Sequence, residues 1–198
     1  ETIVAEAEKA VNDAYQVIIL STRGVSKSKA SIPTLLVLSA VHQHLVKKGI
    51  RTNCGLVVES GEAREIHHFA TLIGYGANAI NPYLAFETIE DMRKRKLINP
   101  EISHEEAVAN YIKAIGKGIF KIMSKMGIST IRSYTGAQIF EAVGLDEAFV
   151  EKYFTKTPTR LGGIGMETLE EETLLCHRLA YPQEIIEAND LGVGGQYA

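Results

Sequence analysis

Tryptophan is absent from this 198-residue sequence, cysteine and proline are scarce, and neither sign of charge dominates. The two cysteines, Cys54 and Cys176, belong to no CxxC pair or cluster, which excludes a disulfide scaffold and a thiolate metal site. We expect both to be small buried hydrophobic residues in a reducing compartment. The formal net charge of −3 leaves no overall electrostatic footprint for nucleic acid, so we expect no nucleic-acid partner.

Long hydrophobic runs are also missing. The densest apolar stretches, residues 16–21 and 32–40, are well short of the roughly 18 residues that span a bilayer. The first residues have neither the basic head nor the apolar core of a secretory signal. We therefore expect a cytoplasmic chain without a membrane partner. Because the chain begins with Glu1 and not with methionine, we also expect residue 1 to be either an artificial start or the start of a piece cut from a longer polypeptide.

Hydrophobic periodicity divides the first half of the chain into alternating helices and short strands. Apolar residues at three- and four-residue steps predict helices over 1–15, 32–48 and 61–73. Short apolar runs predict strands over 16–22, 52–60 and 78–84. Gly49 and Gly74 directly follow the second and third helices, as glycine often does at a helix end. Two strand–helix units followed by a third strand predict an α/β fold with a parallel β-sheet and crossover helices.

The second half of the chain is predicted to be mostly helical. Ser103 and Glu106 form a capping-box pattern that opens a long helix ending at Lys125. Shorter helices are predicted at 138–143, 146–154 and 169–180, a strand at 131–135 and a glycine-rich turn at 161–165. We assign residues 1–189 to one α/β domain and the glycine-rich residues 190–198 to a tail or linker.

Polar side chains follow each predicted strand, at the edge where open α/β sheets bind ligands. We call this set the rim, and it comprises Arg23, Glu59, Glu62, Arg64, Asn81 and Tyr83. Arg23 and the amides at helix N-termini could hold an anionic ligand there. Alternatively, the rim residues cap helices and pair with one another, for example Glu59 or Glu62 with Arg64. The sequence alone leaves both interpretations open.

No catalytic or metal-binding pattern accompanies the rim. The six histidines lack the i, i+4 spacing that brings two imidazoles to one ion, and there is no HExxH. No phosphate-binding glycine loop and no GxSxG nucleophile elbow is present. Cys176 and His177 are neighbours on a predicted helix, where adjacent side chains point about 100° apart, so the imidazole is poorly placed to activate the thiol. We expect no catalytic residue, metal or cofactor in this chain.

The most unusual feature is a row of lysines at four-residue spacing. This lysine row consists of Lys113, Lys117, Lys121 and Lys125, which lie on one face of the predicted long helix. Like charges at i, i+4 disfavour an isolated helix by about 0.2–0.5 kcal/mol per pair. The row is therefore either a solvated face with acidic neighbours or a contact surface for a protein partner or another domain.

Four stretches of the sequence carry a resemblance to a known family. They are LSTRGVSKSKASIPTLLVLSAVHQHL (20–45), GLVVESGEAREIHHFATLIGYGANAINPYLAFET (55–88), YIKAIGKGIFKIMSKMGISTIRSYTGAQIFEAVGL (111–145) and PTRLGGIG (158–165). In this order they resemble the large (alpha) subunit of glutamate synthase, in the C-terminal part of its central domain. The family usually has an acidic residue, in LSDRG, where this chain has Thr22.

The resemblance implies a non-catalytic part of a larger enzyme. Glutamate synthases make L-glutamate from L-glutamine and 2-oxoglutarate with reducing equivalents, and they join a glutaminase domain, a central domain, an FMN-binding domain with an iron–sulfur cluster and a β-helix domain. The resemblance implies that this chain links the glutaminase and FMN domains near the ammonia path. It also implies a partial, degenerate barrel-like fold without flavin, so that FMN and the iron–sulfur cluster belong to the parent enzyme.

This interpretation assigns some surface residues to contacts between domains. They are the lysine row and the tyrosines near turns, Tyr75, Tyr83 and Tyr134. The alternative is an independent flavin- or anion-binding α/β protein that uses the rim. The absence of a glycine-rich phosphate loop favours the connecting domain over this alternative.

Overall fold

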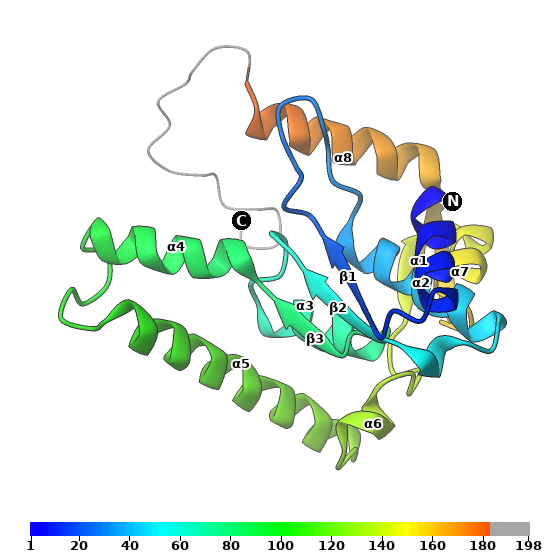
Figure 1. Cartoon of the computed structure of the whole chain (residues 1–198), viewed down its shortest axis with the longest axis horizontal. Helices are drawn as coiled ribbons and strands as arrows, with labels where there is room; N and C mark the ends of the chain where they lie inside the picture. The colour runs from blue at the N-terminus through cyan, green and yellow to red at the C-terminus, as the bar shows by residue number, and fades with distance from the viewer. Residues whose placement is uncertain (183–198) are drawn as a thin grey trace.

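Residues 1–182 are described by a computed structural model of the chain (Figure 1). The elements in chain order are α1 (Thr2–Asn12), β1 (Val17–Ser21), α2 (Thr34–Lys47), the 3₁₀ turn η1 (Arg51–Asn53), β2 (Gly55–Glu59), α3 (Ile66–Gly74), β3 (Ala79–Asn81), α4 (Tyr83–Lys94), α5 (His104–Met126), α6 (Ile131–Tyr134), β4 (Ala142–Leu145), α7 (Glu147–Tyr153), β5 (Thr159–Ile164) and α8 (Met166–Ala180). The predicted tail at 190–198 lies outside the described residues.

The first half of the chain forms the predicted parallel sheet. Strands β1, β2 and β3 lie in that order, all parallel, with α2 and α3 as the crossovers between them. The α/β fold class is therefore confirmed. Strand β2 begins three residues later than predicted, because residues 51–53 form η1, and α3 begins at Ile66 instead of at residue 61.

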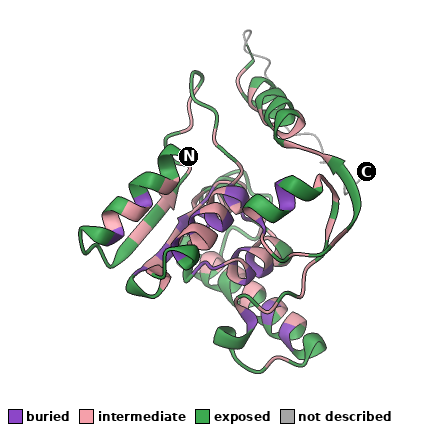
Figure 2. Ribbon diagram, turned by 90° about the vertical axis from the view of Figure 1, so that its right-hand side faces the viewer, coloured by how far each residue is buried: buried purple, intermediate pink, exposed green. Residues whose placement is uncertain are grey.

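One face of the sheet makes the main core. Alternate residues along β2 point to the same side, and Leu56 and Val58 are fully buried there. They pack against Leu38, Val41 and Leu45 of α2, whose three- and four-residue spacing places them on one helix face. Figure 2 shows the buried residues gathered at the centre of the molecule, where these layers meet.

The opposite face of the sheet is open. Val17 and Ile19 of β1 are 56% and 61% exposed, and Ala79 of β3 is exposed as well. The helices cover only the other face, so this one has no covering layer within residues 1–182. The polar residues that end the three strands, Ser21, Glu59 and Asn81, stand in register at its edge.

Helices α4 and α5 form a long hairpin beside the sheet (Figure 1). Helix α4 was not predicted, because Pro82 was taken as the end of a longer strand, whereas it is the residue that precedes the helix. Helix α5 matches its prediction closely, and the hydroxyl of Ser103 accepts a hydrogen bond of 3.1 Å from the backbone N–H of Glu106. Gly127 ends α5 with φ of 70°.

The segment from residue 131 to residue 165, which includes a second parallel pair of strands, β4 and β5, corrects three predictions. Residues 138–143 are not helical and residues 161–165 are not a turn, because residues 142–145 and 159–164 pair as strands connected by α7. The predicted strand at 131–135 is the short helix α6. The adjacent glycines of β5 were taken for a turn, but a Cβ on Gly163 would lie 2.2 Å from the carbonyl oxygen of Gly144. Glycine is needed there for close backbone approach within the pair.

Two further expectations meet different outcomes. Cys54 is buried as predicted, but Cys176, on α8, is exposed. Among the helices within residues 1–182, none combines the length and the apolarity that a membrane-spanning segment needs.

Candidate functional site

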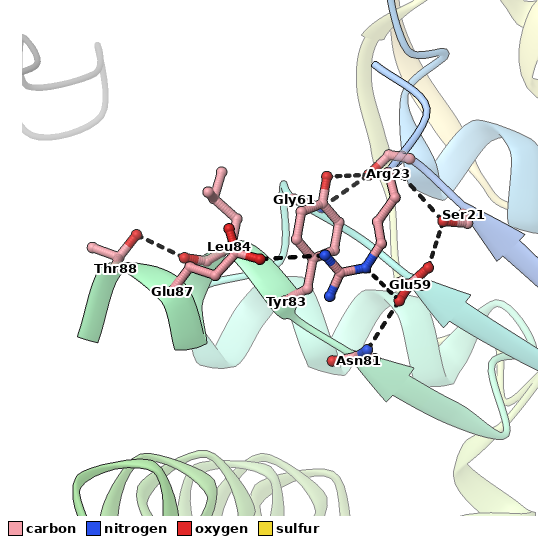
Figure 3. A network of polar contacts seen from close by, with 10 residues as sticks. Ser21, Arg23, Glu59, Gly61, Asn81, Tyr83, Leu84, Glu87 and Thr88 are labelled. Atoms are coloured by element: carbon pink, nitrogen blue, oxygen red, sulfur yellow. Dashed lines mark hydrogen bonds and ion pairs between the residues drawn. The ribbon is translucent and has the colours of Figure 1, made fainter. Parts of the chain in front are cut away.

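The carboxyl edge of the sheet brings three side chains, two of them predicted, around Glu59 (Figure 3). One carboxylate oxygen of Glu59 accepts hydrogen bonds from Nε of Arg23 at 2.7 Å and from the amide nitrogen of Asn81 at 3.2 Å. The other oxygen accepts from the hydroxyl of Ser21 at 2.6 Å. These residues end three neighbouring strands or follow them directly, which is why the parallel register places them together.

Arg23 is held by further contacts from α4. Its guanidinium lies over the ring of Tyr83, 4.1 Å from the ring centroid, and one terminal nitrogen donates to Glu87 at 3.2 Å. One cation therefore serves two carboxylates, so this part of the rim has a net negative charge. A bound anion would have to displace these partners and approach both carboxylates.

The electrostatics of the pair favour permanent charges. Hydrogen bonds from Ser21 and then from Arg23 lower the pKa of Glu59, and the hydrogen bond to Glu59 raises the pKa of Arg23. A carboxylate with a lowered pKa is a weak base and stays ionised at neutral pH, so it has no proton to donate as a general acid. The arrangement is suited to holding loops together.

Thr22 completes the connection between the loops. Its hydroxyl oxygen accepts a hydrogen bond from the backbone N–H of Gly61 at 3.0 Å and lies 3.3 Å from the hydroxyl of Tyr83. The loops that follow β1 and β2 and the start of α4 are thereby joined through one side chain. The threonine that replaces the usual acidic residue of the resembled family thus has a structural role here.

Glu62 lies apart from Glu59 and caps α2 instead. Its carboxylate accepts from the backbone N–H of Thr34, the first residue of α2, at 2.9 Å. The hydroxyl of Thr34 lies 2.9 Å from that of Ser60, which accepts from the backbone N–H of Glu62 at 3.0 Å. The helix N-terminus that could attract an anion is therefore already occupied by a carboxylate of the same chain.

Removing this cap is expected to weaken the fold measurably. Glu62→Ala leaves the N–H of Thr34 without its acceptor, and we expect the free energy of unfolding to fall by about 1 kcal/mol, as for other helix caps. Glu87→Ala is the control, because it removes an exposed ion pair that is worth at most about 0.5 kcal/mol. Urea unfolding followed by circular dichroism measures both; equal losses would contradict the capping role of Glu62.

The structure separates the remaining predicted residues from this network. The predicted pairing of Arg64 with Glu59 or Glu62 does not form: the nearest carboxylate to Arg64 that we find is Glu65, at 4.0 Å. The lysine row lies on α5, in the hairpin with α4. Its side chains are exposed.

Two of the tyrosines assigned to interdomain surfaces belong to the core. Tyr134 is 0% exposed and donates to the backbone carbonyl of Ala70 at 3.2 Å. Tyr75 stacks on Phe140, with ring centroids 5.5 Å apart, and its hydroxyl lies 2.7 Å from that of Thr157. Their positions near turns suggested exposure, but the ring of Phe140 packs against both of them.

Sequence reasoning missed Ser21, Thr22 and Glu87 as members of the network. Ser21 is the last residue of β1, and its position in the strand-end register was the signal that could have identified it. Glu87 lies on α4, which the sequence analysis did not predict. No group of three or more His, Cys, Asp or Glu side chains within residues 1–182 is arranged to hold a metal ion.

The comparisons of the sequence with known proteins point to one family. The family described as glutamate synthase central domain matches residues 1–146. The chain is 49% identical over 193 residues to the glutamate synthase (NADPH) large chain of Bacillus subtilis. The match covers 97% of this chain but 12% of that protein. It is 43% identical over 184 residues to the glutamate synthase (NADH) of Schizosaccharomyces pombe, a match that covers 93% of this chain and 9% of that protein.

A solved structure provides a likeness of fold. A mutant flavocytochrome b2 with benzoylformate superposes with a TM-score of 0.57 at 16% sequence identity, over 76% of this chain and 38% of that chain. At this identity the likeness concerns the arrangement of the elements alone. The chain spans 12% and 9% of the length of these two curated relatives.

Proposed function

Because the chain belongs to the glutamate synthase central domain family, we propose that it is a non-catalytic connecting part of a glutamate synthase. The parent enzyme would make L-glutamate from L-glutamine and 2-oxoglutarate with reducing equivalents. Its partners would be the glutaminase and FMN-binding domains of the same polypeptide. FMN and the iron–sulfur cluster would be held by those other domains.

The observation that carries the proposal is the state of the polar edge of the sheet. Where an enzyme of this architecture would place reactive groups, Glu59 and Arg23 neutralise each other and hold the loops after the strands. The α2 N-terminus is capped by Glu62. Such side chains stabilise a scaffold, because Glu59, Arg23 and Glu62 each bond to a partner within the chain.

The same geometry argues against an independent flavin- or anion-binding protein. A flavin phosphate would need free amides at a helix N-terminus or an unpaired cation. Arg23 is engaged by Glu59, by Glu87 and by the ring of Tyr83. We therefore place ligand binding in the neighbouring domains and structural connection in this one.

The test is Glu59→Gln in the intact parent enzyme. If Glu59 were a general acid or base, its loss would cost about 10²–10⁴-fold in turnover. As a structural partner of Arg23, its replacement is expected to cost less than about tenfold in glutamine-dependent glutamate synthesis, because the neutral amide still accepts hydrogen bonds. Glu87→Gln, which faces the same guanidinium from α4, is the matched control; a loss of about 10²-fold or more for Glu59→Gln alone would overturn the proposal.

A further inference from the structure

The lysine row on α5 lacks partners within the described chain. Its four side chains are exposed, and none makes an ion pair or a side-chain hydrogen bond within residues 1–182. No residue three or four positions from any of them is acidic, because the acidic residues of α5 are Glu105 and Glu106 in the first turn. The lysine row therefore plays no structural role within residues 1–182, and the positive charges of its four side chains repel one another.

A second row of residues runs beside the lysines. Ile112 and Phe120 are 54% and 67% exposed, and Gly116 lies between them at the same four-residue spacing. A Cβ on Gly116 would meet nothing within 4 Å, so the glycine leaves an open notch between two apolar side chains. Lys117 is three residues from Phe120, which makes the two rows neighbours on the helix surface.

The core does not require this exposed apolar row. The buried side of α5 packs on α3 through Ile119 and Met123, which lie three positions from Gly116 and Phe120, so the exposed apolar row runs along the border between this buried side and the lysine row. The two glycines of α5 differ in their surroundings. The side chain of Ile66 occupies the space beside Gly118, whereas the space beside Gly116 is open. The outward surface thus has the form of a packing site that no segment of residues 1–182 occupies: a basic ridge, an apolar ridge and a notch.

The charge and shape of this surface specify the chemistry of its partner. Two helices pack when the ridge of one enters the groove of the other. A helix with carboxylates along one row would neutralise the lysine row, and an apolar side chain beside them would fill the notch at Gly116. A membrane fits less well, because interfacial helices place their apolar face in the lipid and their lysines at the flanks. Here the lysines occupy the centre of the exposed face of α5.

We propose that the outward face of α5 docks an acidic amphipathic helix from another domain of the same glutamate synthase polypeptide. The inference rests on the proposed connecting role, and names the surface by which the connection is made. Lys117 and Lys121 are at the middle of the contact, and Gly116 receives an apolar side chain.

Carbodiimide cross-linking of the intact enzyme, followed by mass spectrometry, tests the contact directly. This reagent joins a lysine to a carboxylate only when the two are in ion-pair contact. We expect Lys117 and Lys121 to be linked to Asp or Glu residues outside this 198-residue segment. We also expect their acetylation to be at least tenfold slower in the native enzyme than in the urea-denatured enzyme. Acetylation at equal rates, without such cross-links, would overturn the proposal.

Charge reversal tests whether the contact matters. Lys117→Glu with Lys121→Glu should abolish the cross-links at Lys113 and Lys125, and uncouple glutamine hydrolysis from glutamate formation. Reversing the carboxylates found by cross-linking should restore both. Lys9→Glu with Lys27→Glu is the control, because it makes the same change in net charge at exposed positions elsewhere. Equal effects of the two double variants would overturn the inference.

Two further measurements separate the remaining outcomes. Gly116→Leu fills open space in this chain, so it should leave the thermal midpoint unchanged or higher but reduce the cross-links. Cosedimentation of the intact enzyme with phosphatidylserine vesicles, lost on Lys117→Glu with Lys121→Glu, would favour a membrane and overturn the proposal. The result for Glu59→Gln is independent of these, so the docking surface and the non-catalytic role can fail separately.

Discussion

Tyr134→Ala is expected to lower the free energy of unfolding by about 3–5 kcal/mol, the usual cost of deleting a large buried aromatic ring. Tyr134 is 0% exposed, its ring meets that of Phe140 edge-on with centroids 6.4 Å apart, and its hydroxyl bonds to the carbonyl of Ala70. The substitution leaves a cavity and removes the hydrogen bond to the carbonyl of Ala70. Urea unfolding of the purified chain, followed by circular dichroism, measures the loss.

Two variants show which part of the side chain matters. Tyr134→Phe keeps the ring and removes only the hydrogen bond, so we expect a loss of about 1 kcal/mol. Phe120→Ala removes an aromatic ring of similar size that is exposed, so the expected change is within about 0.5 kcal/mol. Similar losses for Tyr134→Ala and Phe120→Ala would mean that Tyr134 is a surface residue after all.

Acidification from pH 6.5 to about 4.5 is expected to destabilise the chain through His42. Burial, and then the nearby positive charge of Arg51, lower the pKa of His42 from 6.5 to about 4. Its Nδ1 accepts a hydrogen bond from Nε of Arg51 at 2.9 Å, which requires the neutral ring. In this window the unfolded state binds a proton that the folded state does not bind, so stability is present above pH 6.5 and is lost as the pH falls.

The size of the effect follows from the shift. The full difference in pKa corresponds to about 3 kcal/mol, and screening of the partly exposed ring reduces the expected loss to about 2 kcal/mol. Carboxylates with a lowered pKa, such as those of Glu8 and Glu90, begin to lose their contribution only near their unfolded value of 4.5, at the lower end of this window.

Urea unfolding at several pH values checks the assignment to His42. His42→Gln keeps an acceptor for Arg51 but does not titrate, so most of the pH dependence between 6.5 and 4.5 should disappear. A small remainder is expected from His68, whose pKa is also lowered by burial. An unchanged slope in His42→Gln would contradict the account.

Much of the sheet was predictable from the sequence, because the apolar periodicity and the position of Gly49 agree there, although Gly74 is the last residue of α3 and does not follow that helix. The spacing of apolar residues identified α2, and Gly49, with φ of 71°, follows its last turn. Strand β5 was not predictable in the same way. Its glycines serve close contact with the backbone of β4, a requirement that depends on a partner strand and leaves no local pattern.

The candidate site was predictable only in part. The strand-end rule placed Arg23, Glu59 and Asn81 together, because parallel strands end at one edge. It could not say which carboxylate would take Arg23 as its partner. That choice depends on Glu62 reaching the N-terminus of α2, a contact between residues that are 28 positions apart.

The position of Glu62 and the pairing of Arg23 have the same consequence for function. Each removes a group that would attract an anion, and each holds a loop after a strand. We therefore interpret the rim as a set of contacts that stabilises the loops after the strands. The outward face of α5 is the surface that we propose for contact with another domain.

Titration of the purified chain with FMN, followed by quenching of flavin fluorescence, tests the central claim most directly. We expect no binding at concentrations of tens of micromolar, on the order of 10⁻⁵ M, because Arg23 and the N-terminus of α2 are already occupied by Glu59, Glu87 and Glu62. Saturable binding in this range that is weakened by Arg23→Ala would contradict the claim, since it would make the rim a ligand site.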